Sequence, residues 1–357
     1  MKFSIFNFTT RQARKLSAFL FLVFFLLCLS NCEPHEHQIT PAFYHWQTEL
    51  KFTNTEKQYL ASLSAQKLYI KFFDVDWDFT RKEAIAKATL ITNTEIANSL
   101  TIVPTIFITN RTLVHLPTNE VKDLVDKVVK KLIRQFRDFP NQTIQEIQID
   151  CDWTLSTKDK YFQLLTFLNR QFSQKAIYLS STIRLHQIKY PEKMGIPPVK
   201  RGMLMYYNMG EVRNYHTHNS ILDNAIGQRY LSKLSTYPLP LDVALPLFQW
   251  GVLFRNGKMI KLINQLKATD LRDSQRFDKI DDTHWEIKKS TYLNGVYLYE
   301  KDEIRLEKVK LTDLQAAAML LNKQLKVEDR AMAFYHLDSM VIQQFSTKEL
   351  NGVFEKF

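Results

Sequence analysis

The chain has 357 residues, of which 45% are hydrophobic and 13% aromatic, so it can bury a large core and a disordered chain is excluded. Its eight glycines form neither G-x-G-x-x-G nor G-x-x-x-x-G-K-[ST], and we expect no cofactor. The net charge of +11 is not organised into a basic block interleaved with aromatics, so we expect no nucleic-acid partner.

The first residues have the pattern of an export signal. Four basic residues and no acidic one precede Glu33, and an apolar run covers Ala18–Leu29. That run is short for a membrane span, which needs about 20 residues, but it suits the core of a signal peptide. It ends in LSNC, which resembles a bacterial lipobox. We therefore predict a signal peptide at 1–31 and lipidation of Cys32, with an ordinary secretory signal as the alternative.

This signal predicts a membrane-anchored lipoprotein of the bacterial cell envelope, with the outer membrane as the expected location. Lipid chains would anchor the protein and not make it span the membrane. Residues 32–40 would form a polar tether. Cys28 would leave with the signal and Cys32 would be lipidated. Only Cys151 would remain, so no disulfide is possible within the mature chain.

Apolar runs typical of buried strands alternate with helical patterns beyond the tether. Eight strands are predicted, at Pro41–Trp46, Lys67–Val75, Thr101–Thr109, Glu146–Trp153, Ala176–Leu185, Gly202–Asn208, Leu241–Phe248 and Met332–Asp338. Helical spacing of apolar residues separates several of them, as in 121–136, 161–172 and 311–325. Alternating strands and helices of this kind predict an α/β fold, a (β/α)8 TIM-like barrel over 41–357.

One region interrupts the alternation after the seventh strand. Residues from about 251 to 309 contain hairpin-like segments, including YLNGVYLYE with its Asn-Gly turn. We interpret this region as a small antiparallel insertion near the mouth of the barrel.

Polar and aromatic side chains collect where the predicted strands end, which is where barrels of this fold place their functional residues. The candidates, in chain order, are Trp46, Asp74, Asp76, Asp150, Asp152, Arg184, His186, Tyr207, Asn208, Glu211, Gln249, Trp250, His336 and Asp338. Carboxylates and amides can bind sugar hydroxyls, and aromatic rings can lie against sugar rings. The convergence therefore favours a glycan or polysaccharide as the partner.

Two short motifs resemble family 18 glycoside hydrolases. QIDCDWT is similar to the fourth-strand signature D-G-x-D-x-D-x-E, matched by Asp150 and Asp152, and LMYYN is similar to the sixth-strand M-x-Y-D, matched by Met205 and Tyr207. Both motifs lie on the expected strands in the expected order. The resemblance implies a (β/α)8 barrel with catalytic roles for Asp150, Asp152 and Tyr207.

The chain departs from that family at the acid. The family's proton-donating Glu corresponds to Thr154, its first Asp to Ile147 and its sixth-strand Asp to Asn208. A threonine cannot act as a general acid near neutral pH. The substrate-assisted reaction that the family uses is therefore not expected in its usual form.

Three hypotheses remain for the paired aspartates. Asp152 could be a rearranged acid whose pKa Asp150 raises, with Glu211 or Asp76 as a further carboxylate. The barrel could bind a glycan without cleaving it, or be a structural lipoprotein. A Ca²⁺ or Mg²⁺ site is the third, but DVDWDF (74–79) lacks the Gly and Glu of a calcium loop, so we predict no metal. A glycan-processing enzyme is preferred over a glycan-binding protein.

Overall fold

The structure is a computed structural model that describes residues 37–92 and 96–357. The predicted signal peptide, Cys32 and most of the predicted tether lie outside the described residues. Within the described residues, no helix combines the length and the apolar character that crossing a membrane requires.

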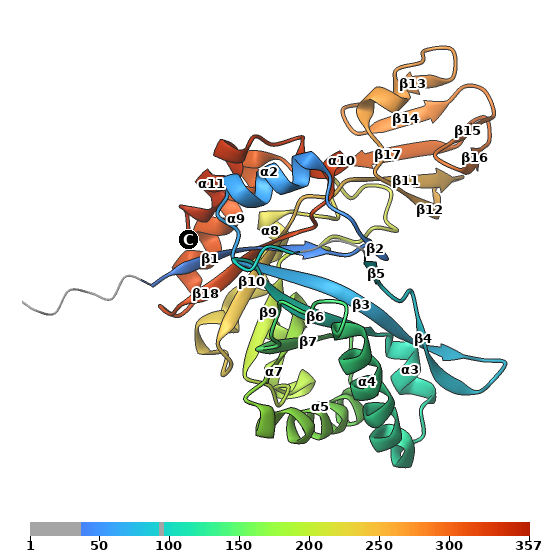
Figure 1. The fold of residues 1–357 in the computed structure, drawn as a ribbon. Helices are drawn as coiled ribbons and strands as arrows, with labels where there is room; N and C mark the ends of the chain where they lie inside the picture. Colours follow the sequence, from blue (N-terminus) through green and yellow to red (C-terminus); the bar gives the residue numbers. More distant parts are fainter. Residues whose placement is uncertain (1–36, 93–95) are drawn as a thin grey trace, which may run out of the picture. The chain divides into compact units, whose positions relative to one another are not determined.

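Eight parallel strands close into a barrel, which confirms the predicted fold class (Figure 1). In the order in which they neighbour one another, the strands are β1 (Ile39–His45), β18 (Arg330–Tyr335), β10 (Leu241–Pro246), β9 (Arg201–Met205), β8 (Tyr178–Arg184), β7 (Glu146–Asp150), β6 (Thr101–Ile108) and β3 (Lys67–Asp78). A pairing of β1 with β3 closes the ring, and β4 (Glu83–Lys87) pairs antiparallel with the long end of β3.

Several predicted strand limits were wrong by a few residues. Strand β1 begins at Ile39, inside the predicted tether, because its pairing with β18 starts there. Strand β7 ends at Asp150, and the amide of Cys151 donates to the side-chain Oγ1 of Thr182 on β8 instead of to a backbone carbonyl. Strand β9 ends at Met205. The chemically interesting residues 151–154 and 206–208 therefore belong to loops at the mouth.

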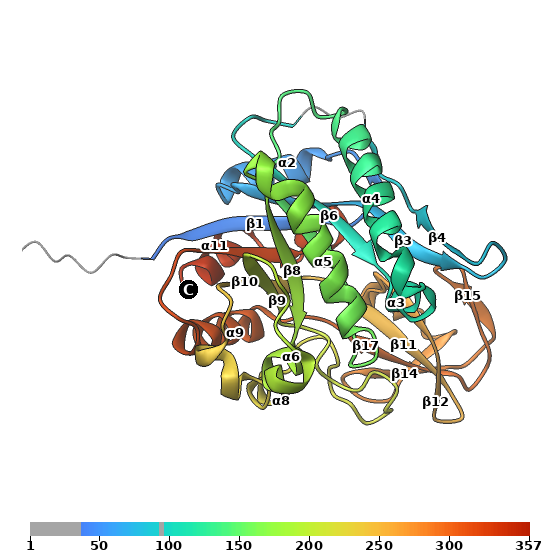
Figure 2. The same cartoon turned by 90° about the horizontal axis from the view of Figure 1, so that it is seen from below.

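Helices cover the outside of the barrel, as the apolar spacing predicted. Figure 2 shows α4 and α5 side by side over the outer face of the sheet. The larger helices are α2 (Asn54–Ser62), α4 (Val121–Phe136), α5 (Lys158–Phe172), α9 (Leu311–Gln324) and α11 (Thr347–Phe354). Short helices and turns follow at α3 (Asn110–His115), α6 (Leu185–Lys189), α7 (Pro191–Met194), α8 (Asn224–Gln228) and α10 (Ser339–Ile342), and β2 (Glu49–Leu50) pairs with β5 (Ile91–Thr92).

The strand alternation divides the core into two layers. Outward-facing residues pack against the helices in one large apolar cluster. Inward-facing residues form a second cluster inside the barrel, where the rings of Tyr44 and Tyr69 stack with centroids 4.8 Å apart. Tyr44 donates to Oε1 of the buried Gln148 over 2.5 Å. The barrel interior is therefore filled with side chains below the mouth.

The region after β10 forms a separate antiparallel sheet with its own apolar core. Its strands are β12 (Lys258–Asn264), β11 (Trp250–Arg255), β17 (Glu303–Glu307), β14 (His284–Ile287) and β13 (Phe277–Lys279) in sheet order, with the hairpin β15 (Thr291–Leu293) and β16 (Val296–Leu298) beside them. Asn294 and Gly295 both have positive φ and make the predicted Asn-Gly turn. We call Trp250–Glu307 the insertion.

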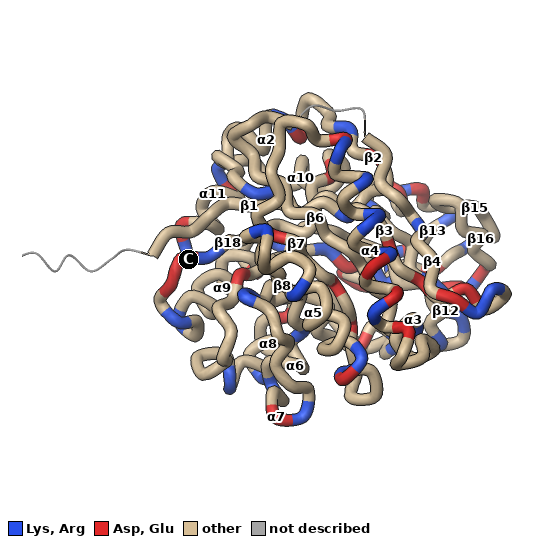
Figure 3. Tube along the Cα trace, turned by 60° about the horizontal axis from the view of Figure 1, so that its bottom comes forward, with Lys and Arg blue, Asp and Glu red and all other residues tan. Residues whose placement is uncertain are grey.

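Charged residues of both signs alternate along much of the chain. Figure 3 shows Lys and Arg interspersed with Asp and Glu over many elements. A mixture of this kind is typical of a solvated surface.

Candidate functional site

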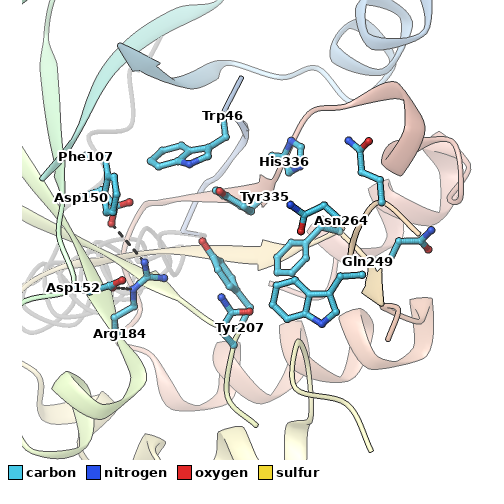
Figure 4. A pocket seen from close by; sticks show the side chains of 14 residues that line it. Trp46, Phe107, Asp150, Asp152, Arg184, Tyr207, Gln249, Asn264, Tyr335 and His336 are labelled. Carbon is cyan, nitrogen blue, oxygen red and sulfur yellow. Dashed lines mark hydrogen bonds and ion pairs between the residues drawn. The ribbon is translucent and has the colours of Figure 1, made fainter. Parts of the chain in front are cut away.

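A cleft of about 390 Å³ lies at the carboxyl ends of the barrel strands (Figure 4). It combines charged, amide and aromatic side chains from seven barrel strands or the loops after them and from the insertion. The residues that line it are Trp46, Phe107, Asp150, Asp152, Arg184, Tyr207, Asn208, Phe248, Gln249, Trp250, Asn264, Gln265, Tyr335 and His336. The cleft thus brings together nine of the candidate residues that the sequence predicted at the strand ends.

Arg184 joins the two aspartates at the bottom of the cleft. Its Nη2 lies 3.7 Å from Asp150 Oδ1, and its Nε donates a hydrogen bond to Asp152 Oδ1 (Figure 4). Thr182, two residues earlier on β8, donates to Asp150 Oδ1 over 2.6 Å. Arg184 and Thr182 share a face of β8 because strand residues two apart point the same way. The two aspartates therefore face one cation, and do not form an isolated pair.

The two carboxyl groups differ in their surroundings. Asp150 is buried, whereas the side chain of Asp152 is 55% exposed. Burial raises the pKa of Asp150, and the nearby charge of Asp152 raises it further, while Arg184 and the hydrogen bond from Thr182 oppose the rise. Asp150 is thus the carboxyl group of the cleft that holds a proton to higher pH than usual.

Aromatic rings form one wall of the cleft. The rings of Tyr207 and Tyr335 stack with centroids 5.3 Å apart, and Phe248 and Trp46 lie against Tyr335 at 5.9 and 5.7 Å. The guanidinium of Arg184 lies over the Tyr207 ring at 5.9 Å. Burial raises the pKa of Tyr207 well above its usual value, so its hydroxyl stays neutral at physiological pH.

The insertion continues this wall, since the ring of Trp250 lies 5.2 Å from that of Phe248. Trp250 donates from Nε1 to Glu307 Oε2 over 2.9 Å, and Gln249 donates to the carbonyl of Leu266 over 2.8 Å. Gln265 donates to Asp338 Oδ2 over 2.7 Å. The first bond lies within the insertion, and the other two connect the insertion to the segments that follow β10 and β18.

Two neutral histidines lie next to each other, one lining the cleft and one behind it. His336 lines it, and His45 is buried beside His336. Burial and, less strongly, the nearby His336 together lower the pKa of His45 to about 4, and Asp338 opposes the change. Burial also lowers the pKa of His336. Neither ring is therefore a cation at neutral pH.

A second cleft of about 290 Å³ adjoins the first. The two share Asp152, Arg184, Tyr207 and Asn208 as a common wall. The second cleft extends to His186, Leu185, Met209 and Tyr230. Of the two residues predicted at the end of the fifth strand, Arg184 therefore lines both clefts and His186 lines the second.

Four predicted carboxylates, Asp74, Asp76, Glu211 and Asp338, line neither cleft. Asp76 is bound by Arg111, Lys87 and Thr109, which hold the pKa of its carboxyl well below its usual range. Asp74 makes an ion pair with Lys71 at 3.3 Å, and burial raises its pKa. Glu211 is exposed in the loop after β9. Asp76 and Glu211 therefore do not act as the second carboxylate in this arrangement.

Asp338 has a structural role beside the cleft. Its Oδ1 accepts from the amide of Met340 over 2.8 Å at the start of α10, and its Oδ2 accepts from Gln47 and Gln265. An aspartate at this position satisfies a free amide at a helix start. It supports the cleft residue Gln265 and is not among the residues that line the cleft.

Thr154, at the position of the family's acid, is exposed and directed toward its own loop. Its Oγ1 lies 3.0 Å from Ser156 Oγ and 3.3 Å from Thr157 Oγ1, just before α5. It is not among the residues that line the cleft. Over the part of the chain that the structure describes, no group of three or more His, Cys, Asp or Glu side chains is arranged to hold a metal ion.

Sequence reasoning missed five residues of the cleft: Phe107, Phe248, Asn264, Gln265 and Tyr335. Phe107, Phe248 and Tyr335 lie at or beside predicted strand ends, so an aromatic residue there was an available signal. Asn264 and Gln265 belong to the insertion, and nothing in the local sequence shows that this turn reaches the barrel mouth.

No protein-family model and no curated sequence matches the chain. Solved structures do. The spore cortex-lytic enzyme SleL of Bacillus megaterium QM B1551 matches with a TM-score of 0.54 and 14% identity, covering 91% of this chain and 75% of SleL. The class V chitinase of Nicotiana tobaccum matches with a TM-score of 0.54 and 10% identity, covering 89% of this chain and 99% of the chitinase.

A chitinase from Chromobacterium violaceum ATCC 12472 gives a TM-score of 0.51 at 10% identity, with 88% and 99% of the two chains covered. At such identities the likeness concerns the fold. It confirms, at that level, the predicted remote resemblance to family 18 glycoside hydrolases.

Proposed function

We propose that the chain is a glycan-binding barrel whose main cleft holds part of a polysaccharide. The observation that carries the proposal is the cleft itself, in which Arg184 and two aspartates face a wall of aromatic rings. Rings such as Trp46 and Tyr335 offer apolar faces to a sugar ring, while the charged and amide groups pair with hydroxyls. Two similar folds are named chitinases, and a mutant of the tobacco chitinase is in complex with NAG4, so N-acetylglucosamine polymers are the first ligands to test.

Binding without cleavage accounts best for the acid groups. A glycosidase needs a protonated carboxyl group at the leaving oxygen. Within the described part of the chain, Asp150 and Asp152 are the carboxyl groups that line the cleft, and both face the permanent cation Arg184. An arginine at that distance favours the ionised form of a carboxyl group. Thr154 supplies no acid.

Hydrolysis is the second candidate, and one observation favours it. Burial raises the pKa of Asp150, so this group retains a proton at higher pH than an exposed aspartate does. Asp152 would then be the ionised partner, and Tyr207 would bind the substrate. A glycan that displaced Arg184 from Asp150 would raise the pKa further and supply a general acid.

One experiment separates the two functions. Residues 33–357 would be incubated with NAG4, chitin, peptidoglycan and a panel of other bacterial and host polysaccharides, with Asp150→Asn and Asp152→Asn as variants. Binding would be measured by calorimetry and products by mass spectrometry. Binding without products supports the proposal, whereas oligosaccharides that vanish in both variants establish a hydrolase. Folded protein that binds nothing in the panel would refute both.

We also propose that the protein is anchored to the cell envelope through Cys32. The LSNC pattern after a basic and apolar segment supports this proposal. The test is mass spectrometry of the protein purified from bacterial membranes. We expect the mature protein to begin at Cys32 and to carry acyl chains there, and we expect no acylation of a Cys32→Ser variant. An unmodified Cys32 would contradict the proposal.

A further inference from the structure

Three tyrosines are exposed on the hairpin of the insertion. The exposed fractions of Tyr292, Tyr297 and Tyr299 are 70%, 41% and 51%. Tyr292 and Tyr297 are directly opposite each other in the pairing of β15 with β16, and their ring centroids lie 4.9 Å apart. Tyr297 and Tyr299 are two residues apart, with centroids also 4.9 Å apart. The three rings thus form one contiguous aromatic surface, which we call the tyrosine platform.

The platform is held in place by an ion pair beneath it. Arg255 lies over the Tyr299 ring at 4.2 Å and donates two hydrogen bonds to Asp302, at 2.7 and 2.9 Å. The buried Asp302 also accepts from the amide of Tyr299 over 2.8 Å. Bidentate pairing fixes the guanidinium plane. The Tyr299 end of the platform is therefore held in place before any ligand arrives, which reduces the entropy lost on binding.

The chemistry of the platform fits a glycan better than a lipid surface. Each ring offers an apolar face and a hydroxyl, the combination that a sugar ring with its own hydroxyls can use. Tyrosine occurs at the membrane–water interface, but segments that insert below the headgroups bury Leu, Phe and Trp side chains. On this hairpin the leucines, Leu293 and Leu298, are buried in the core of the insertion.

The platform and the cleft are joined by one strand. Strand β11 begins at Trp250, which lines the cleft, and ends at Arg255, which supports the platform. Six strand residues extend about 17 Å. The hairpin lies at the outer edge of the insertion (Figures 1 and 3). We infer that a polymer longer than this span bridges the two sites, whereas a short oligosaccharide occupies one site at a time.

We propose that the tyrosine platform is a second glycan-binding surface, which retains polymeric chains of the same class as the cleft. The choice of N-acetylglucosamine polymers rests on the proposed function, while the site itself rests on the hairpin geometry. Two linked sites raise the avidity for a polymer by about 10²-fold or more over either site alone. The platform would thus hold the protein on an extended or insoluble glycan.

The test compares a polymer with a short ligand. The variant carries Tyr292→Ala, Tyr297→Ala and Tyr299→Ala. Its matched control is Phe79→Ala, which removes an aromatic ring of 62% exposure from the β3–β4 turn. Retention on chitin beads and calorimetric binding of NAG4 are measured for both, and co-sedimentation with phosphatidylglycerol vesicles is measured alongside. All positions are exposed, so folding is expected to be unchanged, which circular dichroism would verify.

The proposal expects retention of the triple variant on chitin to fall about 10²-fold while NAG4 still binds the cleft with unchanged affinity, and Phe79→Ala behaves as wild type. Equal retention of the triple variant and the wild type would overturn the platform but not the cleft. The wild type could also be retained on chitin through the tyrosines and yet bind no NAG4. That result would support the platform and refute the cleft. Tyrosine-dependent binding to vesicles only, or no retention of the wild type on chitin, would overturn the proposal.

Discussion

Trp250 donates a hydrogen bond from its indole Nε1 to Glu307 Oε2 over 2.9 Å, and this contact connects a cleft residue to the buried charges of the insertion. Glu307 also accepts from the amide and hydroxyl of Ser220 and pairs with the fully buried Arg305. Arg305 in turn donates to the carbonyls of Val212, Asn214 and Tyr215 in the loop after β9. The position of Trp250 therefore depends on an ion pair that also fixes this loop to the insertion.

Glu307→Ala is expected to lower the free energy of unfolding by about 3–5 kcal/mol, because it leaves Arg305 buried without its charged partner. Glu307→Gln keeps an acceptor for Trp250 and Ser220, and a smaller loss is expected. Denaturation in urea, followed by tryptophan fluorescence, measures both variants. Equal stability of Glu307→Ala and wild type would show that the pair does not hold the insertion in place.

Arg184→Met is expected to destabilise the protein by about 3 kcal/mol at pH 7, because Asp150 would be left as a buried carboxylate beside Asp152. Without the arginine, the pKa of Asp150 rises further above its unfolded value. A folded-state pKa above the unfolded one makes the free energy of unfolding fall as pH rises between the two values. The defect of Arg184→Met should therefore shrink at acidic pH.

The double variant Arg184→Met/Asp150→Asn is the control for this interpretation. Asparagine carries no charge, so the double variant should recover most of the lost stability at pH 7 and lose the pH dependence of the defect. Chemical denaturation at pH 4, 5.5 and 7 measures the cycle. Additive losses from the two substitutions would mean that the ion pair is not the source of the defect.

The strands were predictable from the local pattern of apolar residues. The central site residues were predictable because barrels of this fold carry functional residues at the carboxyl ends of their strands. Apolar runs separated by helical spacing predicted the barrel, and the barrel then places Asp150, Asp152, Arg184 and Tyr207 at one mouth. The role of Arg184 between the aspartates was not predictable, because strand spacing does not determine the distance between side chains on different strands.

The errors arose where tertiary contacts decide the outcome. Asp76 is at a strand end, but Arg111 of α3 and Lys87 of β4 bind its carboxylate outside the cleft. A register shift between Lys71 and Phe73 of β3 also interrupts the alternation on which its assignment depended. Gln265 enters the cleft because the insertion folds against the barrel, which a local pattern cannot show.

His45→Phe tests the buried histidines. The pKa of His45 is about 4 in the folded protein, against an ordinary value of 6.5. Between pH 4 and pH 6.5, His45 is therefore protonated in the unfolded chain and neutral in the folded one. As pH falls from 6.5 to 4, the protonation of His45 should therefore lower the free energy of unfolding of the wild type by about 3 kcal/mol. Asp150 contributes with the opposite sign, so the informative quantity is the difference between variant and wild type.

That difference should favour His45→Phe increasingly as pH falls, because phenylalanine takes up no proton. Nδ1 of His45 has no hydrogen-bond partner, so the substitution removes none at that atom. Urea denaturation from pH 4 to 7 measures it. Parallel curves for the two proteins would show that His45 is not held neutral by the fold.

Trp46→Ala tests the aromatic wall of the cleft. The Trp46 ring contacts the rings of Tyr335 and Phe107, with centroids 5.7 and 6.4 Å away, and lines the cleft. If a sugar ring lies against it, its loss should weaken binding of NAG4 by about 2 kcal/mol, roughly 30-fold in Kd. Trp46→Phe preserves an apolar face and should lose less, and Phe79→Ala, outside the cleft, should bind as wild type. Calorimetry measures all three.

An unchanged Kd for Trp46→Ala, in a protein that still binds NAG4, would show that the sugar ring does not lie against Trp46. The adjoining cleft at His186 and Tyr230 would then be the next place to test, because it shares a wall with the first.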